Sequence, residues 1–334
     1  MRYGNVELHN VCDVVEEGGP GVGVSRLPLD ILPRVNPGAR GMATMSAGCE
    51  IRGMLPPGGS AKVVLACADD NTTPPVATVY HGDFCGGSVF VPHEGREISI
   101  SPPEKMALMS SISGGCESAF DPRLVRVRLP SIHRCRIVSI EGDLAYPEPG
   151  MTPSTTMLSY GSSITHGACG IPPEGTYASQ CARRLGCDLL NLGFGGSAQM
   201  DEAIAEHIAS RDDWDLATFE MGINVRRWPL EDFRAAAERF VSIVAEAHPD
   251  KWLFCIDIFT CDCDLGATPV HGEGFREAVA EIVEKRNSGK VVHVDGRDVL
   301  TDPTGLRTDL VHPADDGMQE MGRNLAEAIS RHRE

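Results

Sequence analysis

The sequence of 334 residues is poor in aromatic and basic side chains and lacks a long apolar run. Aromatic residues make up 5%, and no stretch approaches the roughly 20 apolar residues of a membrane-spanning helix. Lysine and arginine total 30 against 47 aspartates and glutamates, a formal net charge of -17. This charge repels nucleic-acid phosphates and anionic lipids, so we expect neither nucleic acid nor a membrane as a partner.

The amino terminus and the cysteines indicate a reducing compartment. Residues 1–7 lack the apolar core of a secretory signal, so we expect a cytoplasmic location. The 12 cysteines are scattered over a chain far longer than disulfide-stapled scaffolds, which favours reduced thiols. The one tight group, Cys261-Asp262-Cys263, lacks the second ligand pair of a structural zinc site. We therefore predict no bound metal.

The first part of the chain has the composition of a β-domain. A chain of this length exceeds the size at which one hydrophobic core usually stops growing, so two domains are expected. Residues 20–150 are rich in glycine and proline, with short β-type runs and almost no helical periodicity. In the run 125–129 apolar and charged residues alternate, as in a strand with one face in water. We predict an antiparallel, jelly-roll-like β-sandwich over residues 1–150. Further candidate strands are 62–65, 77–80, 88–91 and 137–140.

Beyond three prolines and a glycine at residues 146–153, the pattern changes. Apolar runs alternate with amphipathic segments such as 231–247, whose apolar residues fall on one helical face. This alternation predicts a parallel sheet with helices on both faces over residues 151–334, and ligands at the carboxyl ends of the strands. The apolar runs are 157–160, 188–192, 216–219, 252–256 and 291–294.

A serine follows the first of these runs, in Gly161-Ser162-Ser163-Ile164-Thr165. At such a strand end the hydroxyl of Ser163 can stand above the sheet with its own backbone N–H nearby, as a nucleophile requires. Small residues at a strand end mostly form plain turns, so this segment taken alone favours a turn over a nucleophile.

Asp309 and His312 lie three residues apart in one loop near the end of the chain. A nucleophilic serine needs a base, and the base needs an acceptor on its other ring nitrogen. Asp309 and His312 can meet in this way, whereas a solvated turn with an exposed histidine is the alternative. His166 has no aspartate at a short fixed spacing, so we favour His312 as the base and expect His166 to contact the substrate.

Two further segments follow the second and third apolar runs and contain Gly196 and Asn224. Acyl transfer places negative charge on a former carbonyl oxygen, and a backbone N–H or an asparagine amide can donate hydrogen bonds to it. A turn glycine and a loop-capping asparagine are the alternatives. Arg226 and Trp228 follow directly and are candidate substrate-binding residues, because arginine binds polar groups and indole stacks on sugar rings. A solvated loop anchored by the tryptophan is the other interpretation.

In order and spacing, the four segments resemble those of the SGNH hydrolases, also called the GDSL family. The resemblance implies a flavodoxin-like three-layer α/β/α fold, with Ser163 as nucleophile, His312 as base and Asp309 as its orienting partner. It also implies an oxyanion hole formed by the N–H groups of Ser163 and Gly196 and the side chain of Asn224. A reaction of this kind requires no cofactor.

The resemblance covers roughly residues 155–331 and departs from the family pattern at two positions. Ser162 stands where the family usually has aspartate before the nucleophile, and Val225 follows Asn224 where aspartate is common. Neither change removes a group from the chemical step. A β-sandwich before the catalytic domain is similar to the arrangement in several carbohydrate esterases of this family. We therefore expect a serine esterase that removes short acyl groups, above all acetyl, from a small-molecule or oligosaccharide ester.

Two other functions stay open on the sequence alone. One is a lipase or thioesterase for longer acyl chains, which the 5% aromatic content and the lack of a long apolar lid segment disfavour. The other is a non-catalytic sugar-binding protein on the same fold, which would have no use for Ser163 and His312 together. A β-sandwich can also close a neighbour's active site, so a homo-oligomer is compatible with this organisation.

Overall fold

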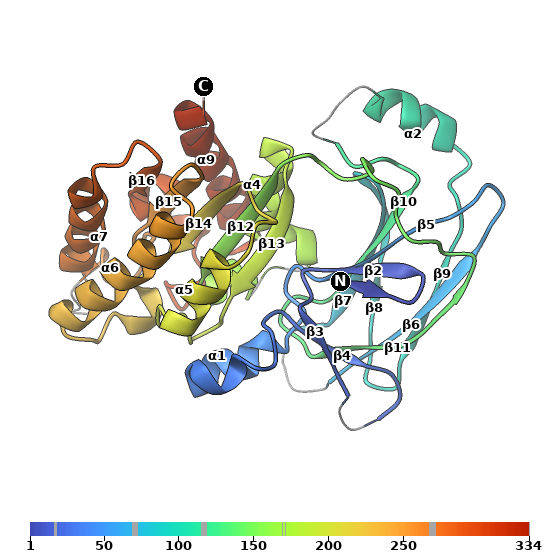
Figure 1. The fold of residues 1–334 in the computed structure, drawn as a ribbon, viewed down its shortest axis with the longest axis horizontal. Coiled ribbons are helices and arrows are strands. Elements are labelled where there is room, and N and C mark those ends of the chain that lie inside the picture. Colours follow the sequence, from blue (N-terminus) through green and yellow to red (C-terminus); the bar gives the residue numbers. More distant parts are fainter. Residues whose placement is uncertain are drawn as a thin grey trace.

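The computed structural model describes residues 1–16, 19–68, 73–114, 119–168, 170, 172–266 and 272–333. Figure 1 shows two regions side by side, one of antiparallel strands and one of parallel strands flanked by helices. No helix in these residues is both long and apolar enough to cross a lipid bilayer.

Antiparallel strands form the amino-terminal region, as the sequence predicts. In the described residues they make a six-stranded sheet of order β1-β2-β5-β10-β7-β8, a three-stranded sheet of order β11-β6-β9 and the pair β3-β4. Buried side chains from both larger sheets, among them Ile51, Val63 and Val127, share one core, so the β-sandwich prediction is confirmed. The strands are β1 (Arg2–Tyr3), β2 (Val6–His9), β3 (Asp13–Val15), β4 (Gly23–Ser25), β5 (Glu50–Met54), β6 (Ala61–Cys67), β7 (Val76–His81), β8 (Phe84–Phe90), β9 (Arg96–Ile100), β10 (Leu124–Arg128) and β11 (Cys135–Gly142).

This region also contains two short helices that the sequence pattern does not predict, α1 (Pro37–Ala43) and α2 (Met106–Ser113). They are too short for apolar periodicity to emerge. Asn36 caps α1 by accepting a hydrogen bond from the N–H of Ala39. Ala39 and Ala43 pack into the core of the parallel-sheet region, next to which α1 lies in Figure 1. The predicted domain boundary after residue 150 stays a prediction.

The carboxyl-terminal region contains the predicted parallel sheet, with strand order β13-β12-β14-β15-β16. This order, with the first strand second in the sheet, is that of flavodoxin-like folds. All five apolar runs of the sequence lie in these strands, which confirms the predicted fold class. They are β12 (Thr156–Gly161), β13 (Asp188–Gly193), β14 (Leu216–Glu220), β15 (Trp252–Ile256) and β16 (Val291–Val294).

Helices cover both faces of this sheet (Figure 1). On one face α5, α6 and α7 share a core with Tyr160 and Phe219, and on the other α4 and α9 pack together over Met157 and Ile256. The predicted helix over 231–247 is α6. The helices are α3 (Ser163–His166), α4 (Tyr177–Leu185), α5 (Glu202–Ala209), α6 (Leu230–Ala247), α7 (Gly272–Arg286), α8 (Gly296–Val299) and α9 (Asp315–Arg333).

The prediction that the alternating run 125–129 has one face in water is wrong, because both faces of strand β10 are buried. Its charged residues Arg126 and Arg128 are 7% and 9% exposed, and do not face water as predicted. Arg126 donates hydrogen bonds of 2.8 and 2.7 Å to the carboxylate of Glu50, and Arg128 donates one of 2.9 Å to Ser179 Oγ in α4. The charged face of β10 is therefore turned toward the carboxyl-terminal region.

A buried ion pair also joins the two regions. Arg52 of β5 donates hydrogen bonds of 2.6 and 2.7 Å to the two carboxylate oxygens of Asp188 in β13. The side chains are only 1% and 8% exposed. Arg52 also donates a 2.8 Å hydrogen bond to Glu50, so breaking the pair with Asp188 leaves a buried positive charge that is only partly compensated. The pair therefore helps to fix how the two regions meet.

Candidate active site

Three of the predicted side chains meet at the carboxyl end of the parallel sheet. Ser163 begins α3 directly after β12, and its Oγ lies 2.8 Å from Nε2 of His312. On the other side of the ring, Nδ1 of His312 lies 2.8 Å from Oδ2 of Asp309. An aspartate in this position holds the proton on Nδ1 and leaves Nε2 free to accept the serine proton. The three residues thus have the geometry of a nucleophile, a base and an orienting carboxylate.

The loop that carries the base is held by its own hydrogen bonds. Oδ1 of Asp309 accepts bonds of 3.0 and 2.9 Å from the N–H groups of Val311 and His312. Burial opposes ionisation of Asp309, but these bonds and the imidazole lower its pKa below the ordinary value. Leu310 has a φ of +54°, and its carbonyl accepts a 2.7 Å hydrogen bond from the N–H of Asp262. The side chains of Asp309 and His312 are 50% and 27% exposed, so the site is open to solvent.

A buried carboxylate supports the turn before the nucleophile. Glu220, the last residue of β14, accepts a 2.5 Å hydrogen bond from the N–H of Ser162 and one of 3.1 Å from Thr165 Oγ1. The side chain of Ser162 in turn accepts a bond from the N–H of Ile164 and so caps α3. Burial raises the pKa of Glu220. The role of Glu220 was not predicted from the sequence, although a carboxylate at a strand end shortly before Asn224 was a signal.

The three expected oxyanion donors are available for a ligand. Within the described part of the chain, the N–H groups of Ser163 and Gly196 donate no hydrogen bond. Gly196 has a φ of +66°, which favours glycine. A Cβ added to the neighbouring Gly195 would lie 3.7 Å from Cβ of Ser163, so this turn is adjacent to the nucleophile. Asn224 Oδ1 accepts a 2.9 Å bond from the N–H of Ala198, which leaves the Nδ2 donor of the same amide for other partners.

His166 has surroundings that differ from the predicted ones. It is 1% exposed, and Nε2 lies 3.2 Å from the carbonyl oxygen of Ser131 in the amino-terminal region. Nδ1 accepts a 3.1 Å hydrogen bond from the N–H of Gly195. Burial lowers the pKa of His166, which agrees with a neutral ring that donates at Nε2 and accepts at Nδ1. Both nitrogens are therefore engaged, and His166 supports the glycine turn formed by Gly195 and Gly196. Substrate contact by His166 stays a prediction.

The amino-terminal region also contacts this turn and the strand β13 that leads into it. Asn36, the cap of α1, donates a 3.0 Å hydrogen bond to the carbonyl of Ser197. Arg26 is fully buried and donates a 3.0 Å bond to the carbonyl of Asn191, with its guanidinium 5.1 Å from the ring centre of Phe194. These contacts join segments more than 150 residues apart, so no local sequence pattern predicts them.

Arg226 and Trp228 have structural contacts. The guanidinium of Arg226 forms an ion pair with Asp262, with side chains 22% and 14% exposed. Trp228 is partly buried and packs against the core of the parallel-sheet region. These contacts favour the anchored-loop interpretation, and a substrate-binding role for either residue stays a prediction.

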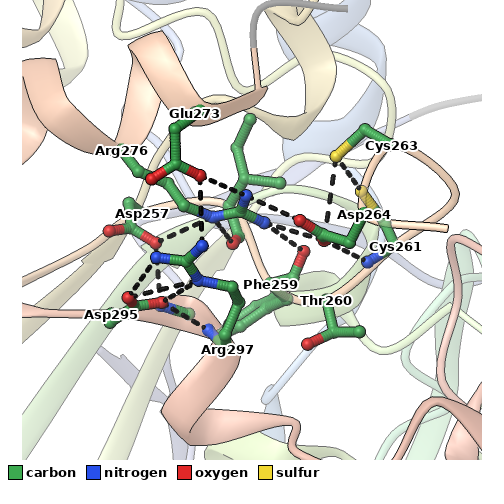
Figure 2. Close-up of polar contacts among 12 residues, drawn as sticks. Asp257, Phe259, Thr260, Cys261, Cys263, Asp264, Glu273, Arg276, Asp295 and Arg297 are labelled. Carbon is green, nitrogen blue, oxygen red and sulfur yellow. Dashed lines mark hydrogen bonds and ion pairs between the residues drawn. The ribbon is translucent and has the colours of Figure 1, made fainter. Parts of the chain in front are cut away.

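One group of side chains has ligand atoms close enough together for a metal. Those of Cys261, Cys263 and Asp264 lie within 4.8 Å of one another. Both carboxylate oxygens of Asp264, however, accept hydrogen bonds from Arg276, at 2.8 and 2.9 Å (Figure 2). A cation here would meet the guanidinium charge, so this group does not fit a metal site well.

The geometry agrees with what comparisons with known proteins find. Residues 159–320 match the model of the GDSL-like Lipase/Acylhydrolase family. No curated protein matches the sequence.

Among solved structures, the chain is similar over nearly its whole length to the salicylyl-acyltransferase SsfX3 from a tetracycline biosynthetic pathway, with 19% identity, a TM-score of 0.79 and coverage of 98% of this chain and 95% of that one. It is also similar to a GDSL-like lipase from Bacteroides ovatus, with 19% identity, a TM-score of 0.73 and coverage of 92% and 91%. A carbohydrate esterase family 2 enzyme from Corynascus thermopiles (Myceliophthora fergusii) has 16% identity, a TM-score of 0.61 and coverage of 90% and 98%. At these identities the likeness is one of fold.

Proposed function

Through residues 159–320 this chain belongs to the GDSL-like lipase/acylhydrolase family, and on that premise we propose that it is a serine esterase for short acyl groups. The preferred substrate is an acetylated carbohydrate hydroxyl. The observation that carries the proposal is the hydrogen-bonded line from Ser163 Oγ through His312 to Asp309, with both links at 2.8 Å.

In the proposed reaction Ser163 Oγ attacks the ester carbonyl while Nε2 of His312 takes its proton. Asp309 stabilises the resulting imidazolium, and its lowered pKa keeps it ionised. The N–H groups of Ser163 and Gly196 and Nδ2 of Asn224 donate to the oxyanion. The protonated His312 then gives its proton to the departing alcohol. Water attacks the acyl-enzyme with His312 again as base, and the acid leaves.

The open surface around the base supports a bulky alcohol. Asp309 is half exposed, so the leaving side of the ester can extend into solvent. A sugar or oligosaccharide fits such a site better than a long acyl chain, which needs an enclosed apolar channel. The fold that this chain shares with a family 2 carbohydrate esterase also supports a carbohydrate substrate.

Hydrolysis of p-nitrophenyl acetate, butyrate and octanoate tests the acyl preference, and acetate release from acetylated oligosaccharides tests the alcohol. We expect the rate to fall with chain length and Ser163→Ala to abolish hydrolysis while circular dichroism stays unchanged. A rate that rises toward octanoate would favour the lipase or thioesterase alternative. Sugar binding without turnover by the wild type would favour the non-catalytic alternative.

Acyl transfer to an alcohol is a second candidate, because the structural likeness to the salicylyl-acyltransferase spans 98% of the chain. The same acyl-enzyme serves both reactions, and only the acceptor differs. Adding increasing concentrations of a sugar alcohol to the p-nitrophenyl acetate assay separates them. A transferase forms acetylated alcohol at the expense of acetate, whereas a hydrolase continues to release acetate.

A further inference from the structure

Two thiols in the loop after β15 lie in contact with each other. Sγ of Cys261 and Sγ of Cys263 are 3.0 Å apart, and neither cysteine forms a disulfide (Figure 2). Cys261 is buried and Cys263 is partly exposed. The hydrogen bond from the Cys261 thiol lowers the pKa of Cys263 to about 7, and the same bond raises that of Cys261. Much of Cys263 is therefore the nucleophilic thiolate at neutral pH.

A buried arginine fixes this loop in place. The side chain of Arg276 is 4% exposed and donates hydrogen bonds of 2.8 and 2.9 Å to Asp264 (Figure 2). Oδ2 of Asp264 also accepts a 3.0 Å bond from the N–H of Cys261. Burial and the charge of Asp264 oppose the Cys263 thiolate, and the guanidinium charge of Arg276 offsets part of this opposition. The same guanidinium charge disfavours a metal cation between the sulfurs.

The residue between the two cysteines connects them to the candidate active site. Asp262 donates its N–H to the carbonyl of Leu310 at 2.7 Å, and its carboxylate pairs with Arg226, two residues after Asn224. Leu310 lies between Asp309 and His312 in the left-handed region, which is unfavourable for a non-glycine residue. The hydrogen bond from Asp262 helps to hold this conformation. A rearrangement of residues 261–263 therefore alters the loop that positions the base His312.

We propose that Cys261 and Cys263 form an oxidation site at which a hydroperoxide produces an intrachain disulfide and lowers the activity of the enzyme. The Cys263 thiolate attacks the peroxide oxygen, the O–O bond breaks, and hydroxide leaves and is protonated to water. Cys261 loses its proton and attacks the sulfur of the Cys263 sulfenic acid, and a second water leaves. In total, two thiols and one hydrogen peroxide give one disulfide and two waters. The sulfurs must approach to about 2.05 Å, which displaces Asp262 from Leu310.

Other cysteines of the chain show why this pair is selective. Cys67 and Cys135 are register partners on β6 and β11, but they are 2% and 1% exposed, and the hydrogen bond between the Cys135 thiol and Cys67, together with burial, raises the pKa of Cys135. Both thiols are therefore shielded from an oxidant in solution, and Cys135 is poorly ionised. Cys85 is exposed, and no thiol partner for it lies among the described residues.

The test treats reduced full-length protein with hydrogen peroxide and follows three quantities: intact mass, ester hydrolysis, and hydrogen exchange of residues 306–312. Wild type should lose two thiol hydrogens, with the new bond mapped between Cys261 and Cys263. Its activity should fall by about fivefold or more, in the usual range of coupled sites, and recover with dithiothreitol. Exchange at residues 306–312 should rise in parallel.

The single variants Cys261→Ser and Cys263→Ser should form no such bond and show no dithiothreitol-reversible loss. Cys85→Ser, the control, should behave as wild type. A disulfide that forms without a change in activity or exchange would overturn the coupling, and reversible loss that persists in Cys263→Ser would overturn the site. The measurement of ester hydrolysis in this test rests on the proposed esterase function. If reduced wild type hydrolyses no ester, that proposal fails, while mass and exchange still decide this one.

Discussion

The carboxylate of Glu220 accepts a 2.5 Å hydrogen bond from the backbone N–H of Ser162, the residue directly before the proposed nucleophile. Family members usually have an aspartate at this position, whereas this chain has a serine. Glu220 reaches the same turn from the neighbouring strand β14, and Thr165 donates to the same oxygen. A carboxylate from another part of the chain therefore supports the turn that presents Ser163.

Replacing Glu220 separates its hydrogen bonds from its charge. Glu220→Gln keeps an oxygen that can accept from Ser162, so we expect most of the activity to remain. Glu220→Ala removes the acceptor, and a misplaced nucleophile should lower kcat by about 100-fold. Steady-state kinetics of both variants checks this. Equal activity of Glu220→Ala and wild type would contradict the positioning role.

The pH dependence of stability tests the burial of Glu220. Burial raises its pKa above the ordinary 4.5, so the folded state binds the proton more tightly than the unfolded state. The stabilisation of the folded state by this tighter proton binding is complete below pH 4.5. It is lost as the pH rises through the raised pKa of Glu220. Urea unfolding should show wild type losing stability relative to Glu220→Gln over this window. A difference that stays constant with pH would contradict the raised pKa.

Asn224 permits a clean test of the oxyanion donors. Asn224→Asp keeps the oxygen that accepts from Ala198 but removes the Nδ2 donor. We expect kcat to fall by about 100- to 1000-fold with a small change in KM, because the lost bond matters most in the transition state. Asn224→Ala should be at least as impaired. An active Asn224→Asp enzyme would remove this amide from the proposed mechanism.

His166 should act on kcat through the glycine turn. His166→Phe leaves the buried carbonyl of Ser131 and the N–H of Gly195 without partners, so the turn should shift and kcat should fall by about 100-fold. His166→Gln can supply a donor and an acceptor and should restore part of the rate. If the main effect of both variants were a raised KM with kcat unchanged, the original prediction of substrate contact would be favoured instead.

The ion pair between Arg52 and Asp188 should dominate the contribution of charges to stability. Asp188→Asn leaves Arg52 with only the buried carboxylate of Glu50, which Arg126 shares, and should cost about 3–5 kcal/mol in urea unfolding. Glu97→Gln, which breaks the exposed pair with Lys62, is the control and should cost no more than about 1 kcal/mol. Similar losses in both variants would contradict the role of burial.

The same pair gives a pH dependence of opposite sign to that of Glu220. Burial opposes ionisation of Asp188, but Arg52 lowers its pKa well below the ordinary 3.8. The stabilisation of the folded state by ionised Asp188 is complete above the pKa that this residue has in the unfolded chain. It is lost as the pH falls through the lowered pKa of the folded state. Wild type should therefore lose stability in acid relative to Asp188→Asn. A difference between the two proteins that does not change below pH 3.8 would contradict this sign.

Local patterns predicted the strands and the segments of the candidate site. Apolar runs mark β12 to β16 because buried parallel strands are apolar on both faces. Ser163, Asp309 and His312 are brought together as predicted, because strand ends and loops of this fold meet at one edge of the sheet. Their catalytic roles stay proposals.

Residues whose partners are distant in the chain escaped prediction. The alternation of β10 resembles that of a solvated strand, and only the carboxylate of Glu50 and the contact with α4 explain why Arg126 and Arg128 are buried. His166 resembles a pocket residue until the carbonyl of Ser131 is seen beside it. In each case the deciding partner lies more than 30 residues away, beyond the reach of local periodicity.

The most direct test of the central claim is to locate the acyl group during turnover. Wild type is mixed with p-nitrophenyl acetate, quenched in acid within milliseconds and mapped by peptide mass spectrometry, beside Ser163→Ala. The proposed mechanism predicts an acetyl group on Ser163 in the wild type and its absence in the variant, together with loss of hydrolysis. An acetyl group on another residue, or an unchanged rate of hydrolysis in Ser163→Ala, would contradict it.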